Sequence, residues 1–208
     1  MPPSIVNVGY RSTNYWVIST GRARILVDLG WPGSIGTMRA NLARADIPLG
    51  EIRYALATHY HIDHAGLAQD LKDAGVPLLL IDLQVPFVPL MKRHIKPRDR
   101  FTDISLAGNV VIPAAESRAL LKRLGIDGEI LHTPGHSDDS VSLLLDEGPV
   151  FTGDLTHPTM VGLEDPHVVR ASWRLLQDGG ATLVHAGHGP VHELPALDGR
   201  DSSMPDSA

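Results

Sequence analysis

The stretch Thr58–Gly66, which reads THYHIDHAG, places three histidines and one aspartate within six positions. These side chains are His59, His61, Asp63 and His64. Imidazole nitrogens and carboxylate oxygens are suitable ligands for zinc and also for iron or manganese. In an extended segment the first three would alternate and lean to one side, while His64 would point elsewhere. We predict a metal-binding loop rather than a polar loop whose histidines only satisfy hydrogen bonds.

The segments on either side predict that this cluster lies at a turn from a strand to a helix. The apolar run IRYALAT, over 52–58, predicts a short buried strand that ends at the cluster. HAGLAQDLKDAG, over 64–75, has apolar residues at helical spacing and ends in Gly75, which suits a helix C-cap. Asp63 is placed to cap this helix at its start.

Three distant segments have the same character as the cluster. His136 lies in TPGHS, Asp154 in FTGDL and His188 in HAGHGP, each after an apolar run that predicts a strand. Loops that follow strands can hold such side chains on a rigid scaffold. The glycines beside them permit unusual φ angles and close approach of the backbone. Each segment alone is a weak signal, but with the cluster they indicate a site built from four parts of the chain.

The predicted elements fall into two similar halves. In each half a group of strands is followed by helices, and the main helical patterns cover 34–47, 64–75, 114–125 and 165–180. Two sheets packed face to face with helices outside fit this order better than a doubly wound parallel sheet.

Composition limits the class of protein. The 208 residues are 43% hydrophobic and 20% charged, which is typical of one globular domain. We expect this domain to cover 1–197 and the polar segment 198–208 to form a disordered tail. The net charge of −6 argues against a nucleic-acid partner. No apolar run approaches the roughly 18–20 residues of a membrane span, and no signal segment is evident, so we expect a cytoplasmic protein without a membrane partner. The sequence carries no signal for the oligomeric state.

The set HYHIDH, TPGHS, FTGDL and AGHGP resembles the metallo-β-lactamase superfamily of hydrolases over roughly residues 5–194. The resemblance implies an α+β fold, a four-layer αββα sandwich with a metal site at one edge. It also implies a ligand set, in which a first metal is held by His59, His61 and His136, a second by Asp63, His64 and His188, and both by a bridging Asp154. Asp28, in ILVDLG, matches an aspartate that supports the metal loop from behind the ligands; its alternative role is to cap a turn at a strand end.

The cofactors implied are two Zn²⁺ ions, with iron or manganese as alternatives because all the ligands are His and Asp. Two such metals, about 3.5–4 Å apart, share a hydroxide that attacks the substrate at neutral pH. Asp63 is the residue that we expect to take up the proton.

Two features narrow the choice among the branches of this family. The chain has no cysteine, and Asp154 stands where the first two β-lactamase subclasses place one. Asp154 therefore points to the lactonase, glyoxalase II-like and phosphodiesterase branches. Only about 20 residues follow His188, which leaves no room for the helical substrate domain of glyoxalase II itself. We predict hydrolysis of a small-molecule ester, lactone or thioester. The alternatives are a phosphodiesterase, a β-lactamase-like hydrolase and, from another class, a non-catalytic metal-binding or partner-binding module.

Two further segments are predicted to lie near the substrate. LQVPFVPL is followed by the basic segment Lys92–Arg100, and together they suggest a lid. In it Phe87 faces an apolar acyl group, while Lys92, Arg93 or Arg98 binds an anion. The alternative is a packed loop with a solvated charged rim. His157 follows Asp154 by three residues and is expected to be within reach of the pocket.

Overall fold

The strands of this chain are apolar on both faces, and this forces layers to form on each side of them. In β3 (Arg24–Val27), Ile25 and Val27 point into one core while Leu26 points into another. β8 (Val141–Leu145) behaves in the same way, since Leu143 and Leu144 belong to different cores. Successive side chains of a strand point to opposite faces, so each sheet must be covered twice.

Two sheets carry the fold in residues 2–197, the part of the chain described by this computed structural model. The first has the order β1-β2-β3-β4, with β1 (Ser4–Asn7), β2 (Trp16–Ser19) and β4 (Ile52–Leu56). The second has the order β11-β10-β9-β8-β7, with β7 (Gly128–His132), β9 (Pro149–Gly153), β10 (Leu183–Ala186) and β11 (His192–Glu193). A small parallel pair, β5 (Leu79–Ile81) and β6 (Val110–Ile112), extends from the edge beside β4.

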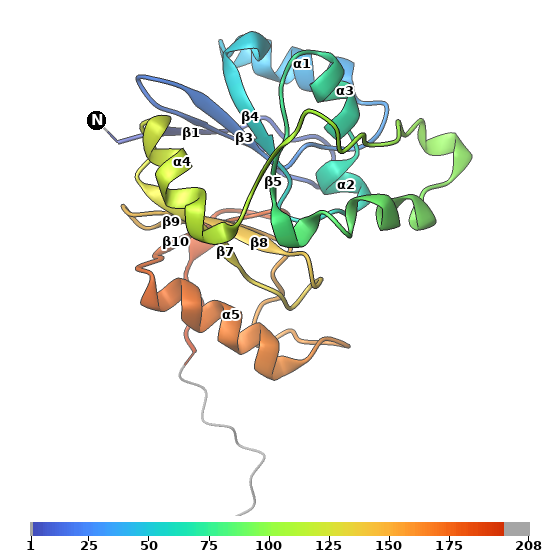
Figure 1. Cartoon of the computed structure of the whole chain (residues 1–208). Helices are drawn as coiled ribbons and strands as arrows, with labels where there is room; N and C mark the ends of the chain where they lie inside the picture. The colour runs from blue at the N-terminus through green and yellow to red at the C-terminus, as the bar shows by residue number, and fades with distance from the viewer. Residues whose placement is uncertain (1, 198–208) are drawn as a thin grey trace, which may run out of the picture.

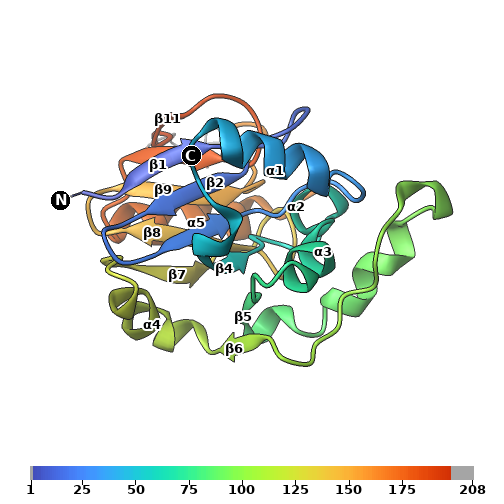
Figure 2. The ribbon, with the colours of Figure 1, turned by 90° about the horizontal axis from the view of Figure 1, so that it is seen from above.

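The helices cover the outer faces of the two sheets (Figure 1). α1 (Ile35–Arg44), α2 (Ile62–Ala65) and α3 (Ala68–Asp73) pack on the first sheet, and α5 (Pro166–Asp178) packs on the second. α4 (Ser117–Arg123) borders the core between the sheets beside β7. Seen from above, α1 lies over the strands of the first sheet (Figure 2). The predicted αββα sandwich is therefore confirmed.

The strand directions bring the predicted site residues to one edge. β3 and β4 are parallel, and so are β9 and β10. β7 runs in the same direction as β9 because both are antiparallel to β8. Asp28, the THYHIDHAG loop and the loops of His136, Asp154 and His188 all follow the carboxyl ends of these strands.

Two local predictions were wrong. The helix expected over 64–75 is two short helices, α2 and α3, because the backbone leaves helical dihedrals at Leu67, with φ −101° and ψ 11°. Gly66, just before it, packs closely, since a Cβ atom on Gly66 would lie 2.3 Å from Pro32 Cδ. The expected cap by Asp63 is also wrong, since α2 begins at Ile62, before Asp63, with His61 at its N-cap position and no side-chain cap. β6 and β11 were not predicted.

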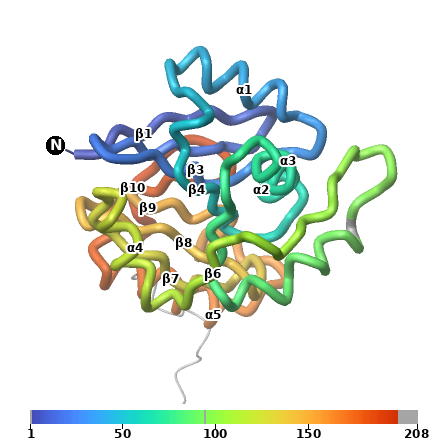
Figure 3. The backbone as a smooth tube through the Cα atoms, turned by 45° about the horizontal axis from the view of Figure 1, so that its top comes forward, coloured from blue at the N-terminus to red at the C-terminus, as the bar shows by residue number. Residues whose placement is uncertain are grey.

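Short 3₁₀ turns make up much of the segment between β5 and β6. Three lie there, at Asp82–Gln84, Val88–His94 and Pro97–Asp99, while Leu49–Glu51 precedes β4 and Ala114–Glu116 follows β6. The part around 88–107 projects from the body of the molecule (Figure 3). None of the helices in residues 2–197 has the length and apolar character that a membrane span needs. The predicted tail over 198–208 lies outside the described residues.

One histidine is buried away from the predicted ligands. His185, on β10, is 6% exposed, and its ring centroid lies 4.8 Å from those of both Trp16 and Phe151. Burial lowers the pKa of His185 because a charged imidazole loses its hydration there. It is therefore a neutral core residue at neutral pH.

Replacing His185 by Phe should make the protein less sensitive to acid. Because the pKa is lower in the folded state, the unfolded chain binds a proton that the folded chain does not. The contribution to the free energy of unfolding is complete above about pH 6.5 and falls as the pH drops, by at most about 1.4 kcal/mol per pH unit. Urea unfolding of metal-free protein at about pH 7.5 and pH 5.5 tests this. If wild type and His185→Phe lose the same free energy of unfolding between these two pH values, the prediction is contradicted.

Candidate metal centre

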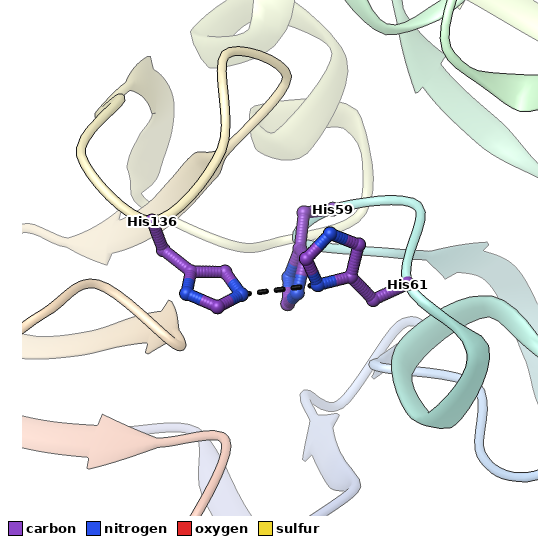
Figure 4. Close-up of side chains that lie close together, drawn as sticks. All are labelled: His59, His61 and His136. Carbon is purple, nitrogen blue, oxygen red and sulfur yellow. Dashed lines mark hydrogen bonds between the residues drawn. The ribbon is translucent and has the colours of Figure 1, made fainter. Parts of the chain in front are cut away.

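The first group of ligand side chains consists of His59, His61 and His136. His59 is buried at the end of β4, and His61 follows in the turn to α2. His136 comes from the loop after β7, in the other sheet. The three rings face one another in Figure 4, with centroids 4.5–4.8 Å apart. His136 Nε2 and His61 Nδ1 are 3.0 Å apart.

The second group consists of Asp63, His64 and His188. α2 places Asp63 and His64 next to each other, so His64 joins the site instead of pointing away from it. His64 Nε2 lies 3.5 Å from Asp63 Oδ2. His188 Nε2, from the loop after β10, lies 3.2 Å from the same oxygen. The prediction of an extended segment through Asp63 is thus wrong, although the grouping is the expected one.

Asp154 lies between the two groups. Its Oδ1 is 3.2 Å from His64 Nε2, and its Oδ2 is 3.3 Å from His188 Nε2 and 3.8 Å from His136 Nε2. The carboxylate therefore lies close to side chains of both groups, His59 and His136 in the first and His64 and His188 in the second. The bridging role itself stays a prediction from the family resemblance.

The donor atoms fit a cation. His59 Nε2, His64 Nε2 and Asp154 Oδ1 are buried and have no hydrogen-bond partner. Ligand atoms of these three side chains lie within 4.8 Å of one another. Buried polar atoms without a partner cost about 1–3 kcal/mol each. Their closeness fits a centre in which metal ions would supply the missing partners.

The electrostatics of the cluster also favour a cation. Burial, followed by the nearby imidazoles, holds the pKa of His59 well below its usual value, so the ring is neutral and offers a lone pair. Burial also acts to lower the pKa of His64, but the carboxylates of Asp28 and Asp154 outweigh it and raise that pKa well above its usual value. For Asp154, burial acts to raise the pKa, yet the surrounding imidazoles lower it overall. The carboxylates thus stabilise positive charge at this position.

Asp28 lies behind the cluster and contacts both Thr58, which precedes His59, and His64. Its Oδ1 accepts hydrogen bonds from the backbone N–H and the hydroxyl of Thr58, both at 2.8 Å. Its Oδ2 lies 2.9 Å from His64 Nδ1. A carboxylate can only accept, so Nδ1 keeps a proton, and Nε2 is the nitrogen that can bind metal when it gives up its own proton. The structure therefore places Asp28 where the family resemblance implied, and not in a turn cap alone.

Two positioning residues were missed by the sequence analysis. Asp139 is buried, and its Oδ2 accepts a hydrogen bond from Tyr60 N at 2.7 Å. Gln84 is also buried and donates to Thr58 O at 3.3 Å and to Asp139 O at 3.2 Å. These bonds join the loop of His59 to the loop of His136. Nothing in the local sequence distinguishes Gln84.

Close packing explains one of the glycines beside the ligands. A Cβ atom at Gly187 would lie 2.5 Å from Asp154 Oδ1 and 2.5 Å from His64 Cε1. Only glycine lets the backbone before His188 pass this close to both groups.

The two tentative pocket residues border cavities beside the cluster. His157 lines a cavity of about 380 Å³ together with His136, Asp154 and His188. Phe87 lines a second cavity, of about 210 Å³, together with His61. Both predicted positions are therefore next to the candidate metal centre.

Comparisons with known proteins agree with this geometry. Residues 8–193 match the Metallo-beta-lactamase superfamily, so the chain belongs to that family. It is a family of metal-dependent hydrolases, and this chain has their fold. A probable metallo-hydrolase of Methanocaldococcus jannaschii is 31% identical over 205 residues, covering 91% of this chain and 93% of the relative.

Two further relatives are informative. An atrochrysone carboxyl ACP thioesterase of Aspergillus chevalieri is 33% identical over 194 residues, covering 89% of this chain. The crystal structure of TTHA1623 in a di-iron-bound form has a TM-score of 0.71 and 28% identity, covering 92% of this chain and 94% of that one. The chain spans only 54% of the thioesterase and 57% of a β-lactamase-like protein 2 homolog of Caenorhabditis elegans.

Changing Asp28 to Asn should weaken metal binding without disturbing the fold. The amide oxygen can keep the bonds to Thr58, but the amide nitrogen facing His64 needs Nδ1 as an acceptor. The proton then moves to Nε2 and blocks it as a ligand. We expect metal affinity to fall by about 10–100-fold, measured by titrating metal-free protein.

The matched control is Asp46→Asn. Asp46 also has a left-handed backbone, with φ 56° against 63° for Asp28, but it is exposed at the end of α1. Unchanged metal affinity in Asp28→Asn would show that Asp28 does not set the tautomer of His64.

Proposed function

We propose that this protein is a hydrolase with a dinuclear metal centre that acts on a small ester, lactone or thioester. The observation that carries the proposal is the convergence of seven metal-capable side chains, with unpartnered buried donor atoms among them. One metal would be held by His59, His61 and His136, and the other by Asp63, His64 and His188, with Asp154 shared. Zinc suits this set of nitrogen and oxygen ligands, and iron or manganese would also suit it.

The chemistry divides between the metals and the protein. When bound, two divalent cations supply Lewis acidity and lower the pKa of a nucleophilic water. Asp63 is the proposed proton acceptor, because its carboxylate is partly open to solvent and lies between His64 and His188. Asp28 and Asp139 keep the ligand loops in place, and the buried side of the cluster excludes water from His59 and His64.

The substrate class is supported by the cavity next to His61. Its walls include the apolar side chains of Phe87, Leu90 and Met91, and Arg93 stands at the same cavity. An apolar acyl group suits the first three, and a carboxylate or phosphate on the substrate suits Arg93. The thioesterase relative adds support for a thioester, and the di-iron neighbour for iron as the alternative metal. A cytoplasmic location remains a prediction from the sequence.

A panel of substrates tests the proposed reaction. Metal-loaded protein should hydrolyse at least one of a set of chromogenic esters, lactones and thioesters, and a chelator should abolish this activity until metal is restored. Asp154→Ala should lower kcat/KM by about 100-fold or more, because both metals lose a shared ligand. Turnover of phosphodiesters or cephalosporins alone would favour the other hydrolases. No turnover by fully loaded protein would favour a non-catalytic module.

Arg93 should bind the anionic part of the substrate. Lys92 is paired with Asp103, and Arg98 lies 3.9 Å from Asp99. Within residues 2–197, Arg93 forms no ion pair, and among the basic residues of Lys92–Arg100 it is the one that lines the cavity next to His61. Arg93→Ala should raise KM for an acidic substrate by about 10-fold, the size of one charge-assisted hydrogen bond, with little change for a neutral one.

The control for this test is Lys92→Ala, which removes a neighbouring charge that is already paired. It should leave both KM values unchanged. An equal rise in KM for acidic and neutral substrates after Arg93→Ala would refute the anion role.

A further inference from the structure

A short turn of the first hairpin lies against the second group of ligands. Thr13 forms a β-bridge with His188, although 175 positions separate them. His188 Nδ1 donates a hydrogen bond to Ser12 O at 2.7 Å. A carbonyl can only accept, so Nδ1 carries a proton, and Nε2, which faces Asp63 and Asp154, is the nitrogen that a metal could bind. The turn Tyr10–Thr13 thus fixes one ligand of the second group through its backbone.

The hydroxyl of Thr13 reaches a second ligand of the same group. Thr13 is buried, and its Oγ1 lies 3.0 Å from Asp63 Oδ2. Trp31 Nε1 lies 3.2 Å from Thr13 Oγ1 on the other side. An indole N–H can only donate, so the hydroxyl accepts from Trp31 and must direct its single proton to Asp63. The direction of this chain of hydrogen bonds is therefore fixed by its chemistry.

Arg11 restrains Trp31, the outer member of this series of hydrogen bonds. The guanidinium of Arg11 lies 5.3 Å from the ring of Trp31 and 5.4 Å from the ring of Tyr10. Arg11 has a left-handed backbone, with φ 60°, which turns its side chain back over these rings. A guanidinium over an aromatic ring is attracted by the negative face of the ring. These contacts restrain the indole whose N–H orients Thr13.

We propose that Thr13 is a positioning residue for Asp63 and thereby sets the affinity of the second metal position. This inference rests on the proposed dinuclear function. Asp63 has a side chain that is 15% exposed, so water can compete for its carboxylate and allow it to rotate. The bond from Thr13 holds Oδ2 toward His64 and His188. The first group receives no contact from this turn among the hydrogen bonds of residues 2–197, so its affinity should not depend on Thr13.

The experiment is a titration of metal-free protein with Zn²⁺, followed by calorimetry, and with Co²⁺, followed by its visible spectrum. Wild type should bind two ions. Thr13→Val keeps the shape but removes the hydroxyl, and we expect the second ion to bind about 10–100-fold more weakly with the first unchanged. Thr13→Ser should bind both ions nearly as wild type does.

Two further variants keep the test decisive. Trp31→Phe removes the indole N–H, so it should weaken the second ion less than Thr13→Val does, and it carries the test if Thr13→Val fails to fold. Thr20→Val is the matched control, because Thr20 also donates a hydroxyl bond, to Leu124 O at 2.8 Å, but lies in the turn between β2 and β3. It should leave both affinities unchanged.

The outcomes separate this inference from the proposed function. Two ions bound by Thr13→Val with wild-type affinities would overturn the inference and leave the function standing. Equal weakening of both ions would also overturn it, since Thr13 would then support the fold rather than Asp63. A wild type that binds only one ion would overturn both the inference and the dinuclear function.

Discussion

The candidate site depends on the carboxylate of Asp28 at the end of β3. It is buried beneath the cluster and satisfies the backbone N–H of Thr58 and the ring of His64 at once. The first bond fixes where the chain leaves β4, and the second fixes which nitrogen of His64 faces the metal position. A left-handed backbone at Asp28 is the local cost, and Asp is one of the few residues other than Gly that adopts it readily.

Strand direction explains why residues so far apart in the sequence meet. β3 and β4 in one sheet, and β7, β9 and β10 in the other, end at the same edge of the sandwich. The two sheets are held face to face by the core that Ile25, Leu143 and Phe151 share. Each ligand loop therefore starts from a buried strand end, and the cluster gains its geometry from the packing of the sheets. The loops only need to carry the correct side chains.

This division explains how much the sequence could predict. The ligands His59, His136 and Asp154 were predicted as candidates because each follows an apolar run. The order of strands and helices favoured two sheets packed face to face with helices outside, and the family resemblance implied the αββα sandwich. The roles of Thr13 and Gln84 could not be predicted, because a hydroxyl or amide partner 50 or 55 positions away leaves no local pattern. The break between α2 and α3 was missed because it falls at Leu67, and leucine favours helices and gives no local signal of a break.

The two proposed metal positions differ chemically, and different elements support them. The first would be formed by three imidazoles and the shared Asp154, while the second adds the carboxylate of Asp63 and has that of Asp28 behind His64. More negative charge therefore surrounds the second position. Exposure does not separate the two groups, because each contains one exposed imidazole, His61 in the first and His188 in the second. The supporting contacts do separate them: the turn Tyr10–Thr13 contacts Asp63 and His188, whereas Gln84 and Asp139 hold the loops of the first group from within the core.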